Sequence, residues 1–435
     1  MAKIAPFCGI RYSQDKITDI SDVVTQPYDR IGPKEQDIYY QRSPYNVCRI
    51  IKGKPEEGDN GGNVYTRAGG HLRTWLEKEV LKKDAEPSLY VYHQAYSFAG
   101  EQLVRKGFVA MGALEPDKVH AHEKTLKGPK EDRLKLMRAT EANFGHIFML
   151  YSDPSRRADR LLDAAIEGSR PIAEAKDDFG NLHTVWSVSE SSTIRGVQQS
   201  LADKDLYIAD GHHRYETAAN FMLECRKKGW KATSSTSFDH RMMTLCNINE
   251  PGMSIRPIHR LVHALPQFDP ESFLRHAKRD FLVSEYRDLN EMEKAVSASR
   301  EEHTFGCYAR GIYSTLTLRD ESLLDEVITE DRSADWKRLD VSILHNLILE
   351  RLLGIDTRAL EEQKNVTYTR DPSEAVSKVD SGEEQAFFLL NSTSPEQVRR
   401  VADHGEKMPQ KSTDFYPKLL TGLVLARLEI EKPTA

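Results

Sequence analysis

The sequence predicts an α+β fold with a mixed sheet core and a second α+β region nearer the C-terminus. Strand-like and helix-like segments alternate irregularly, and no internal repeat or long low-complexity tract interrupts them. An apolar run at 205–210 is followed at once by a turn and a helical pattern. We place the domain boundary just before Pro266. Residues 1–265 then form a core with an inserted hairpin, and 266–435 form a region whose end can return to the functional site.

The first region contains one clear helix and several strands. After a glycine-rich loop at 56–63, apolar residues recur every three or four positions and predict an amphipathic helix that ends near Asp84. The runs 88–98 and 102–114 are rich in Tyr, Val and Phe and predict a β-hairpin. Residues 146–151 and 182–188 predict further strands, with a polar helical segment between them.

The second region repeats this mixture of patterns. Residues 268–281 look helical, and 305–318 predict a hairpin that turns at Arg310 and Gly311. The run 339–355 predicts a strong helix that stops at Gly354, and we interpret it as core scaffold. The run 419–428 has about half the length of a membrane helix, so we expect a core helix there.

Composition narrows the function classes. The chain has 435 residues, is 39% hydrophobic and carries a net charge of −6, which describes a globular protein without an evident attraction to nucleic acid. Its five cysteines are odd in number and widely scattered, a pattern typical of a reducing compartment. The first 15 residues lack the apolar stretch of a signal peptide. We therefore expect a cytoplasmic protein with no membrane and no nucleic-acid partner.

The segment 205–229 is the most informative for chemistry. It reads as strand, turn and helix, with Asp210 as the expected cap and Gly229 as the expected end of the helix. The first turn, Gly211 to Arg214, is unusual because His212, His213 and Arg214 crowd a helix end that is already electropositive. Such a turn can hold a phosphate or carboxylate.

Two other interpretations of this turn remain. In a purely structural one, Asp210 caps the helix, Arg214 pairs with an acidic neighbour and the two histidines are merely exposed. In a metal-binding one, ligands from 120–123 (His120, His122 and Glu123) join Asp210 and one histidine of the turn, although no fixed ligand spacing supports it.

A second dense stretch lies at 119–146. His122 to Lys127 should form a loop before a helix that opens near Gly128-Pro129. There Glu123, beside His122, can act as a general base or a magnesium ligand. A charged, solvated loop is the alternative. Lys130 and Arg133 are further candidates for phosphate binding, and Thr125 for substrate binding.

Two weaker signals complete the candidate site. The segment 43–50 is expected to form a turn that leads Asn46 and Arg49 into a strand, and we assign these two residues to substrate binding only by association with the other motifs. Lys411, Ser412 and Thr413 precede an expected helix, in a loop that either touches phosphate or forms a surface turn. The chain has no P-loop, no dinucleotide-binding glycine motif, no hydrolase nucleophile elbow and no zinc-protease motif.

Seven segments along the whole chain carry a resemblance to a known family. They are IAPFCGIRY, VVTQPYD, SPYNVCRI, HEKTLKGPKEDRL, ATEANFG, YIADGHHRYETA and MPQKSTDFYPKL. In this order they resemble the bacterial and archaeal family called domain of unknown function 1015, which has been described as ParB-like. The ADGHHRYETA segment also resembles the phosphate-binding helix start of the ParB and sulfiredoxin superfamily, where a Gly-x-x-Arg turn contacts nucleotide phosphates.

The superfamily resemblance implies three possible activities, and the sequence distinguishes between them. A DNA-loading switch should carry a basic helix-turn-helix, and a sulfiredoxin should carry a cysteine in the Gly-x-x-Arg turn; this chain has neither. The remaining implication is a kinase that transfers phosphate from ADP or ATP to free serine or a similar alcohol.

On this interpretation Gly211 to Arg214 hold phosphates, Asp210 and Glu123 are candidate Mg²⁺ ligands, and Glu123, His122 and His213 are the catalytic candidates. The alternatives are a non-catalytic nucleotide sensor and a metal-dependent phosphoester hydrolase.

Overall fold

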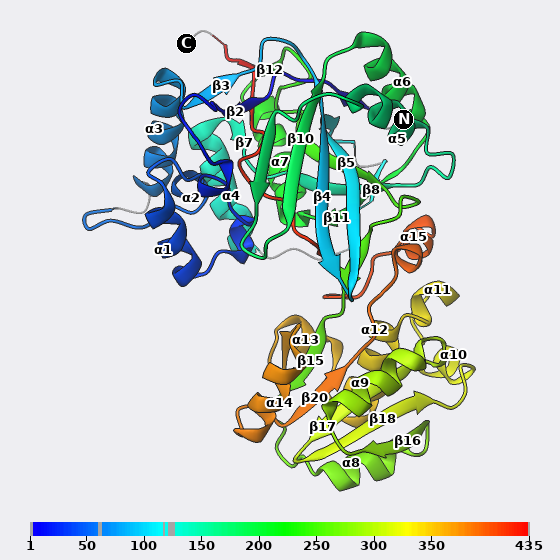
Figure 1. Cartoon of the computed structure of the whole chain (residues 1–435). Helices are drawn as coiled ribbons and strands as arrows, with labels where there is room; N and C mark the ends of the chain where they lie inside the picture. The colour runs from blue at the N-terminus through cyan, green and yellow to red at the C-terminus, as the bar shows by residue number, and fades with distance from the viewer. Residues whose placement is uncertain (1–2, 60–62, 116–117, 121–126, 434–435) are drawn as a thin grey trace. The chain divides into compact units, whose positions relative to one another are not determined.

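The chain divides into two compact units in a computed structural model, which describes residues 3–59, 63–115, 118–120 and 127–433. One unit comprises Met1–Met253 together with Pro417–Ala435, and the other comprises Ser254–Tyr416 (Figure 1). The structure therefore places the first division at 253/254, whereas the sequence analysis placed it at 265/266. The final segment belongs to the first unit because it is packed among that unit's strands, as shown below.

A nine-stranded mixed sheet forms the centre of the first unit. The strand order is β6-β11-β8-β13-β5-β4-β10-β9, with β1 paired to β5. The pairs β13–β8 and β11–β6 are parallel, and the other pairs are antiparallel. The strands are β1 (Ile4–Ala5), β4 (Leu89–Phe98), β5 (Glu101–Ala113), β6 (Val119–His120), β8 (Ile147–Tyr151), β9 (Ala173–Lys176), β10 (Leu182–Val188), β11 (Leu206–Asp210) and β13 (His240–Asn247).

The predicted strands of this sheet are confirmed. β4 and β5 form the expected hairpin, which turns at Ala99-Gly100, where both residues adopt positive φ. The runs 146–151 and 182–188 become β8 and β10. The segment between them forms α5 and then the short strand β9. Apolar and β-branched composition was therefore a sufficient signal for these strands.

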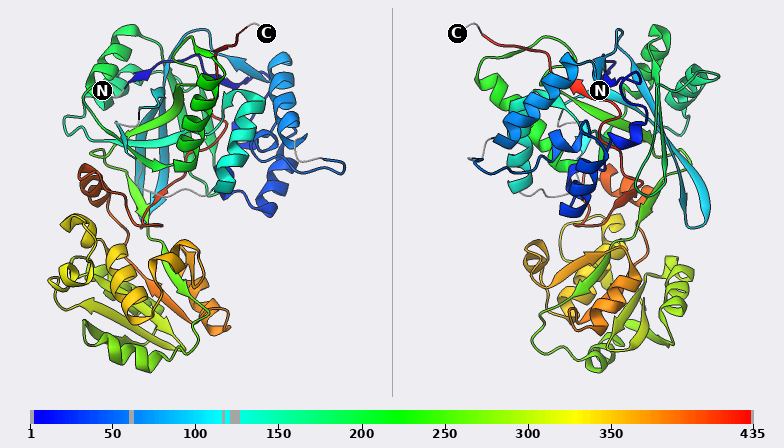
Figure 2. Two further views of the ribbon diagram at one scale, coloured as in Figure 1. Left: turned by 180° about the vertical axis from the view of Figure 1, so that it is seen from behind. Right: turned by 60° about the vertical axis from the view of Figure 1, so that its left-hand side comes forward.

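Helices and short strand pairs surround the sheet. The helices are α1 (Pro33–Arg42), α2 (Cys48–Ile51), α3 (Asn63–Glu77), α4 (Lys127–Thr140), α5 (Arg157–Ile166), α6 (Ser191–Leu201) and α7 (His212–Lys227), with 3₁₀ turns η1 (Ile20–Asp22) and η2 (Tyr28–Arg30). The short pairs are β2 (Ile10–Tyr12) with β3 (Leu81–Lys83), β7 (Ala142–Asn143) with β22 (Ala426–Arg427), and β12 (Lys231–Ala232) with β23 (Ile430–Glu431). Figure 2 shows α1, α2 and α3 on one side of this unit and α5 and α6 on the other.

The helix expected to end near Asp84 ends earlier, at Glu77. Glu79 adopts a left-handed φ of 54°, which breaks the helical path, and the chain then enters strand β3. The apolar pattern from Val64 to Val80 runs past the end of the helix because the chain stays buried as it enters β3, where Leu81 is a buried strand residue.

The prediction of a core helix at 419–428 is wrong. This segment is extended and pairs with three separated parts of the first unit: Thr421 with Thr25, Leu425 with Ile10, and β22 with β7. Gly422 has a φ of 111°, which a continuous right-handed helix does not allow. Nearly every residue of the segment is buried. Its residues are apolar because protein surrounds the extended chain on all sides, and not because they form the buried face of a helix.

An antiparallel six-stranded sheet forms the second unit, in the order β16-β18-β17-β20-β15-β19. The strands are β14 (Ser254–Arg256), β15 (His259–Val262), β16 (Phe281–Tyr286), β17 (Thr304–Ala309), β18 (Ile312–Leu318), β19 (Val366–Thr369), β20 (Ala386–Leu389) and β21 (Asp414–Tyr416), and β14 pairs with β21 apart from the sheet. The predicted hairpin at 305–318 is confirmed as β17 and β18, with its turn at Arg310-Gly311.

Helices cover both faces of this second sheet. Phe387 and Leu389 of β20 join a core with α9 and α14, whereas Phe388 contacts Phe273 of α8. The helices are α8 (Pro270–Ala277), α9 (Leu289–Ala298), α10 (Leu323–Val327), α11 (Ala334–Lys337), α12 (Asp340–Ile343), α13 (Thr357–Glu361), α14 (Pro372–Asp380) and α15 (Pro395–Asp403), with the 3₁₀ turn η3 (Arg300–Glu302) and the π-helix η4 (Leu344–Leu352). The expected helix at 339–355 is thus α12 continued by a π-helix, and most of its apolar residues are buried as predicted, whereas Leu352 is only partly buried.

Two further findings bear on the sequence analysis. All five cysteines are free thiols. Among the described residues, no helix is both long and apolar enough to cross a membrane.

Candidate functional site

The predicted strand, turn and helix at 205–229 are confirmed as β11, Gly211 and α7. The cap differs from the prediction. Gly211, with a φ of 97°, stands at the start of α7, and no side chain caps the helix there. A Cβ at Gly211 would lie only 3.0–3.1 Å from the Arg214 guanidinium, so this position needs glycine both for its backbone and for its space.

Instead of capping α7, Asp210 pairs with two positively charged side chains. Its Oδ1 accepts from Nη2 of Arg214 at 3.4 Å, and its Oδ2 accepts from Nζ of Lys418 at 2.8 Å. Burial raises the pKa of this carboxyl, but Lys418 and Arg214 outweigh burial and hold it well below its ordinary value. Asp210 is therefore ionised at neutral pH, and its negative charge faces two positive ones.

Arg214 points back toward the sheet. Its Nη1 donates to the backbone oxygen of His146, and the residue is only 7% exposed. This contact and the pairing with Asp210 fix the guanidinium at one end of a pocket between α4 and α7. The purely structural interpretation expected Arg214 to pair with an acidic neighbour, and it does pair with Asp210. Arg214 nevertheless also lines the pocket.

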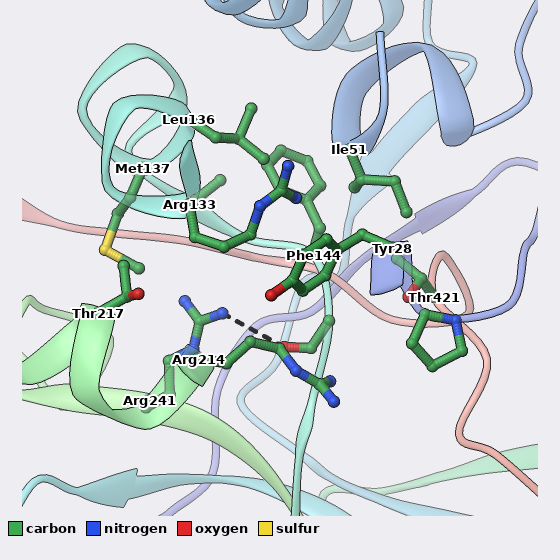
Figure 3. A pocket seen from close by; sticks show the side chains of 13 residues that line it. Tyr28, Ile51, Arg133, Leu136, Met137, Phe144, Arg214, Thr217, Arg241 and Thr421 are labelled. Atoms are coloured by element: carbon green, nitrogen blue, oxygen red, sulfur yellow. Dashed lines mark hydrogen bonds between the residues drawn. The ribbon is translucent and has the colours of Figure 1, made fainter. Parts of the chain in front are cut away.

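The pocket gathers three arginines from three elements: Arg133 from α4, Arg214 from α7 and Arg241 from β13 (Figure 3). Its cavity volume is about 40 Å³. Roughly 10–15 Å³ suffices for one water, so this is space for a few waters or one phosphate-sized anion. The full lining is Pro27, Tyr28, Ile51, Arg133, Leu136, Met137, Ala142, Phe144, Gly145, Arg214, Thr217, Arg241 and Thr421.

Arg241 is the least satisfied of the three guanidinium groups. It is 5% exposed, and its Nη2 donates to the oxygen of Gly145 at 3.3 Å. Its Nε and Nη1 are buried without a hydrogen-bond partner, and no carboxylate in the described part of the chain forms an ion pair with it. Burial lowers its pKa to about 9, with further lowering by Arg214 and Arg133, so it is still charged at pH 7.

Arg133 is held against an aromatic ring. Its guanidinium carbon lies 4.1 Å from the centre of the Tyr28 ring, and its Nε donates to Oδ2 of Asp132 at 2.8 Å. Tyr28 belongs to η2 and extends into the same space as the three arginines in Figure 3. Burial raises the pKa of Tyr28 above its ordinary value, which is already well above neutral pH. Its hydroxyl is therefore protonated and can donate to an anion.

The other walls of the pocket are mostly apolar. Ile51, Leu136, Met137 and Phe144 stand beside the arginines. Apolar walls lower the local dielectric and strengthen the attraction of each guanidinium for an anion. The pocket therefore suits a compact anionic group attached to a less polar one, such as the phosphate end of an organic ligand.

The predicted residues of the helix start contribute unequally. Arg214 and Arg133 line the pocket, while Gly211, His212 and His213 do not. His212 is 4% exposed and makes contacts within the protein, and His213 also has partners. Lys130 donates from Nζ to Oε2 of Glu216 at 2.7 Å rather than into the pocket.

The candidates at 43–50 have structural contacts. Asn46 is fully buried, and its side chain donates to the backbone oxygen of Asp22 and accepts from the amide of Cys48. Arg49 donates to the oxygen of Tyr40 and lies over that residue's ring. Both stabilise the turn before the short helix α2, which stands where a strand was expected, and neither lines the pocket.

Several predictions fall elsewhere. His122, Glu123 and Thr125 lie outside the described residues. Lys411, Ser412 and Thr413 belong to the second unit. Within the described ranges, no group of three or more His, Cys, Asp or Glu side chains is arranged to hold a metal ion.

Sequence reasoning missed Arg241, Tyr28, Phe144 and Thr421 as site residues. Arg241 did carry a signal, because it directly precedes the mostly apolar residues 242–246 of β13, and a charged residue at the start of a buried strand is costly unless it has a purpose. Tyr28 lies in the segment VVTQPYD, which contributed to the family resemblance but was not itself assigned to the site. Thr421 was assigned to a helix, so its pairing with Thr25 beside the pocket could not be foreseen.

Comparison with solved structures finds distant likenesses. A conserved hypothetical protein from Pyrococcus furiosus is 13% identical, with a TM-score of 0.33, and the match covers 72% of this chain and 92% of that one. A free serine kinase in complex with AMP is 13% identical, with a TM-score of 0.33 and coverage of 71% and 86%. SbnI with a C-terminal truncation, from Staphylococcus aureus, is 11% identical, with a TM-score of 0.34 and coverage of 72% and 85%.

No curated protein sequence matches this chain. A family model does match it, over residues 4–342, which include all the pocket residues except Thr421. The chain therefore belongs to the family described as "Protein of unknown function (DUF1015)".

Proposed function

We propose that this protein binds a nucleotide through its phosphates at Arg133, Arg214 and Arg241 and transfers a phosphoryl group from ADP or ATP to a small alcohol such as free serine. The observation that carries the proposal is the buried Arg241 guanidinium, whose Nε and Nη1 have no hydrogen-bond partner among the residues that the structure describes. Unpaired buried charge is strongly unfavourable, so a site that retains it is suited to a ligand of opposite charge.

The two neighbouring arginines make the ligand a phosphate rather than a weaker anion. Three guanidinium groups and a tyrosine hydroxyl around one small cavity can contact all the free oxygens of a phosphoryl group. Phosphoryl transfer depends chiefly on positioning and on neutralising charge that spreads over these oxygens. The apolar wall beside the arginines gives the remainder of the ligand a place to pack.

The acceptor side of the reaction rests on the sequence. His122 and Glu123 immediately precede α4, the helix that carries Arg133, and Glu123 is our candidate for the base that orients the acceptor hydroxyl. The resemblance of the ADGHHRYETA segment to the ParB and sulfiredoxin superfamily supports this choice of reaction and remains a prediction.

The described residues do not fit a magnesium site. The one candidate ligand among them, Asp210, has its two carboxylate oxygens directed at Arg214 and Lys418. We therefore route no step through a protein-held metal. Magnesium in phosphoryl transfer is commonly held largely by the nucleotide phosphates themselves.

The test combines binding and turnover. Purified protein is titrated with ADP, ATP, CTP and GTP in the presence of Mg²⁺, and formation of O-phosphoserine from L-serine is then measured by mass spectrometry. We expect Arg241→Met to weaken nucleotide binding at least tenfold, because a charge-assisted hydrogen bond contributes about 1.5–3 kcal/mol. The matched control Arg138→Met alters an α4 arginine that pairs with Glu224 on the surface and should leave binding unchanged.

The outcomes separate the alternatives. Glu123→Gln should retain nucleotide affinity and lose phosphate transfer. Binding without any transfer to L-serine or to related alcohols would favour a nucleotide sensor. Release of inorganic phosphate from a phosphoester, without an acceptor, would favour a hydrolase. If no nucleotide binds, or if Arg241→Met and Arg138→Met behave alike, the proposed function is wrong.

A further inference from the structure

The second compact unit contains a polar cavity of about 300 Å³ that is separate from the arginine pocket. Its walls come from η3 and the following turn, from α11 and the start of α12, and from α15 with the segment before it. Every side chain that lines it is charged or polar. A cavity of this size with no apolar wall suits a small hydrophilic ligand and not a lipid or an aromatic compound.

Most of the charges in this cavity are paired with one another. Nδ1 of His303 lies 2.8 Å from Oδ1 of Asp340, and Nε of Arg338 donates to Oε2 of Glu321 at 2.8 Å. Arg400 lies 3.5 Å from Asp335. These pairs largely cancel, so they shape the cavity without giving it a preference for an anion or a cation.

Two charged groups that face the cavity are left without a partner. Arg300 and Glu301, consecutive residues of η3, make no ion pair or side-chain hydrogen bond with any other described residue. The hydroxyl of Ser392, another lining residue, likewise has no hydrogen-bond partner within the described ranges. The cavity therefore offers one positive group, one negative group and one neutral polar group that are all unengaged.

We infer that this cavity binds a small zwitterion of the free α-amino acid class. The ligand carboxylate would contact Arg300, its ammonium would contact Glu301, and a polar side chain would reach Ser392. A simple anion would be attracted by Arg300 and repelled by Glu301, and a simple cation would meet the reverse, whereas a molecule with both charges close together interacts favourably with both groups.

The position of α15 supports this choice. The helix begins at Pro395, and residues on both sides of its start, Ser394 and Gln397, line the cavity. The amide of Gln397 donates to Oγ of Ser394, and the amide of Ser394 donates to Oε1 of Gln397. Arg400, three residues after Gln397, also lines the cavity, so α15 lies along the cavity wall and its electropositive start stands at that wall, where it favours a carboxylate.

The first experiment is calorimetric titration of the full-length protein with each of the twenty standard amino acids. We expect at least one to bind with a Kd of about 1 mM or tighter. If L-serine is the best ligand, ethanolamine lacks its carboxylate and 3-hydroxypropionate lacks its ammonium, and both should bind at least tenfold more weakly. For another amino acid, the corresponding amine and acid take their place. Absence of binding by all twenty amino acids overturns the inference, as does equal binding of the two analogues.

Matched variants locate the site. Arg300→Ala and Glu301→Gln should each weaken binding at least tenfold. Arg275→Ala, an exposed arginine on α8, and Glu302→Gln, the neighbour of Glu301 that does not line the cavity, should leave the Kd within about twofold. Equal effects of the test and control variants would refute the assignment.

A variant of the first unit keeps the two proposals distinguishable. Arg241→Met should weaken nucleotide binding at least tenfold and leave amino-acid binding intact. Loss of amino-acid binding in Arg241→Met, with no loss in Arg300→Ala, would place the amino acid in the arginine pocket and refute the second site alone. Failure to bind any nucleotide would refute the proposed function and leave this inference unaffected.

Discussion

Replacing Arg241 by methionine should stabilise the protein in the absence of an anion, although it removes a charged residue that lines the pocket. The guanidinium is enclosed by protein, lies with Arg214 and Arg133 in one small pocket, and makes one hydrogen bond, to the oxygen of Gly145 at 3.3 Å. Methionine has a similar length and a flexible apolar side chain that can fill the space beside Leu136 and Met137.

The expected gain in stability follows from the unpaired buried donors that the substitution removes. Each buried donor without a partner costs about 1–3 kcal/mol, and Arg241 has two such nitrogens, Nε and Nη1. Against this, the substitution loses one hydrogen bond worth about 1 kcal/mol. Replacing buried charge by well-packed apolar groups stabilises other proteins by about 1–4 kcal/mol, and we expect the same range here.

The assay is urea unfolding of wild type and Arg241→Met in buffer without phosphate or sulfate, repeated with added pyrophosphate. In the anion-free buffer the variant should have the larger free energy of unfolding. Pyrophosphate at about 100 times its wild-type Kd should then stabilise wild type by about 2.7 kcal/mol, and a variant that binds tenfold more weakly by only about 1.4 kcal/mol. If Arg241→Met is the less stable protein without an anion, the guanidinium is satisfied within the fold, and the argument for an anion site fails.

Three further predictions follow from the same region. Asp210→Asn should destabilise the protein by about 2–4 kcal/mol at pH 7, because Lys418 and Arg214 lose their counterion; since the folded pKa of Asp210 is depressed, the difference from wild type in urea unfolding should be complete above about pH 4 and shrink as the pH falls below it. Gly211→Ala should cost about 1–3 kcal/mol and weaken pyrophosphate binding, because its Cβ displaces the Arg214 guanidinium; Gly229→Ala, also at positive φ but in open space at the other end of α7, should cost stability and leave pyrophosphate titrations unchanged. Burial lowers the pKa of His146 to about 4, so the unfolded chain binds the extra proton first, and this histidine contributes a loss of about 2–3 kcal/mol between pH 6.5 and pH 4. Because the pKa values of His93 and His259 are lowered as well, His146→Gln should still lose stability in urea unfolding over this range, but by about 2–3 kcal/mol less than wild type.

Local patterns in the sequence were enough to predict the elements that carry the site. The apolar run of β11, the glycine after it and the buried face of α7 are encoded within one continuous stretch of the chain. Hairpins β4–β5 and β17–β18 are also local, because their strands pair across short turns. In each case the residues that decide the structure are neighbours in the sequence.

The pocket itself could not be predicted in this way because its arginines come from separate strands and helices. Arg241 reaches the site because β13 pairs with both β5 and β8, and nothing near residue 241 specifies that register. Asp210 was expected to cap α7 because aspartate is a good cap, but the long-range ion pair with Lys418 determines its role. Such contacts depend on the topology of the whole sheet.

The last segment of the chain shows how the fold brings distant residues to the site. Lys418 and Thr421 complete the site of the first unit, yet residues 254–416 separate them from the rest of that unit. Closing so long a loop has an entropic cost that grows with its length. The second unit limits this cost because its own first and last strands, β14 and β21, pair with each other, with Ser254 opposite Tyr416. Once the second unit has folded, Pro417 begins where Met253 ends, and the return of Lys418 to Asp210 becomes a local step.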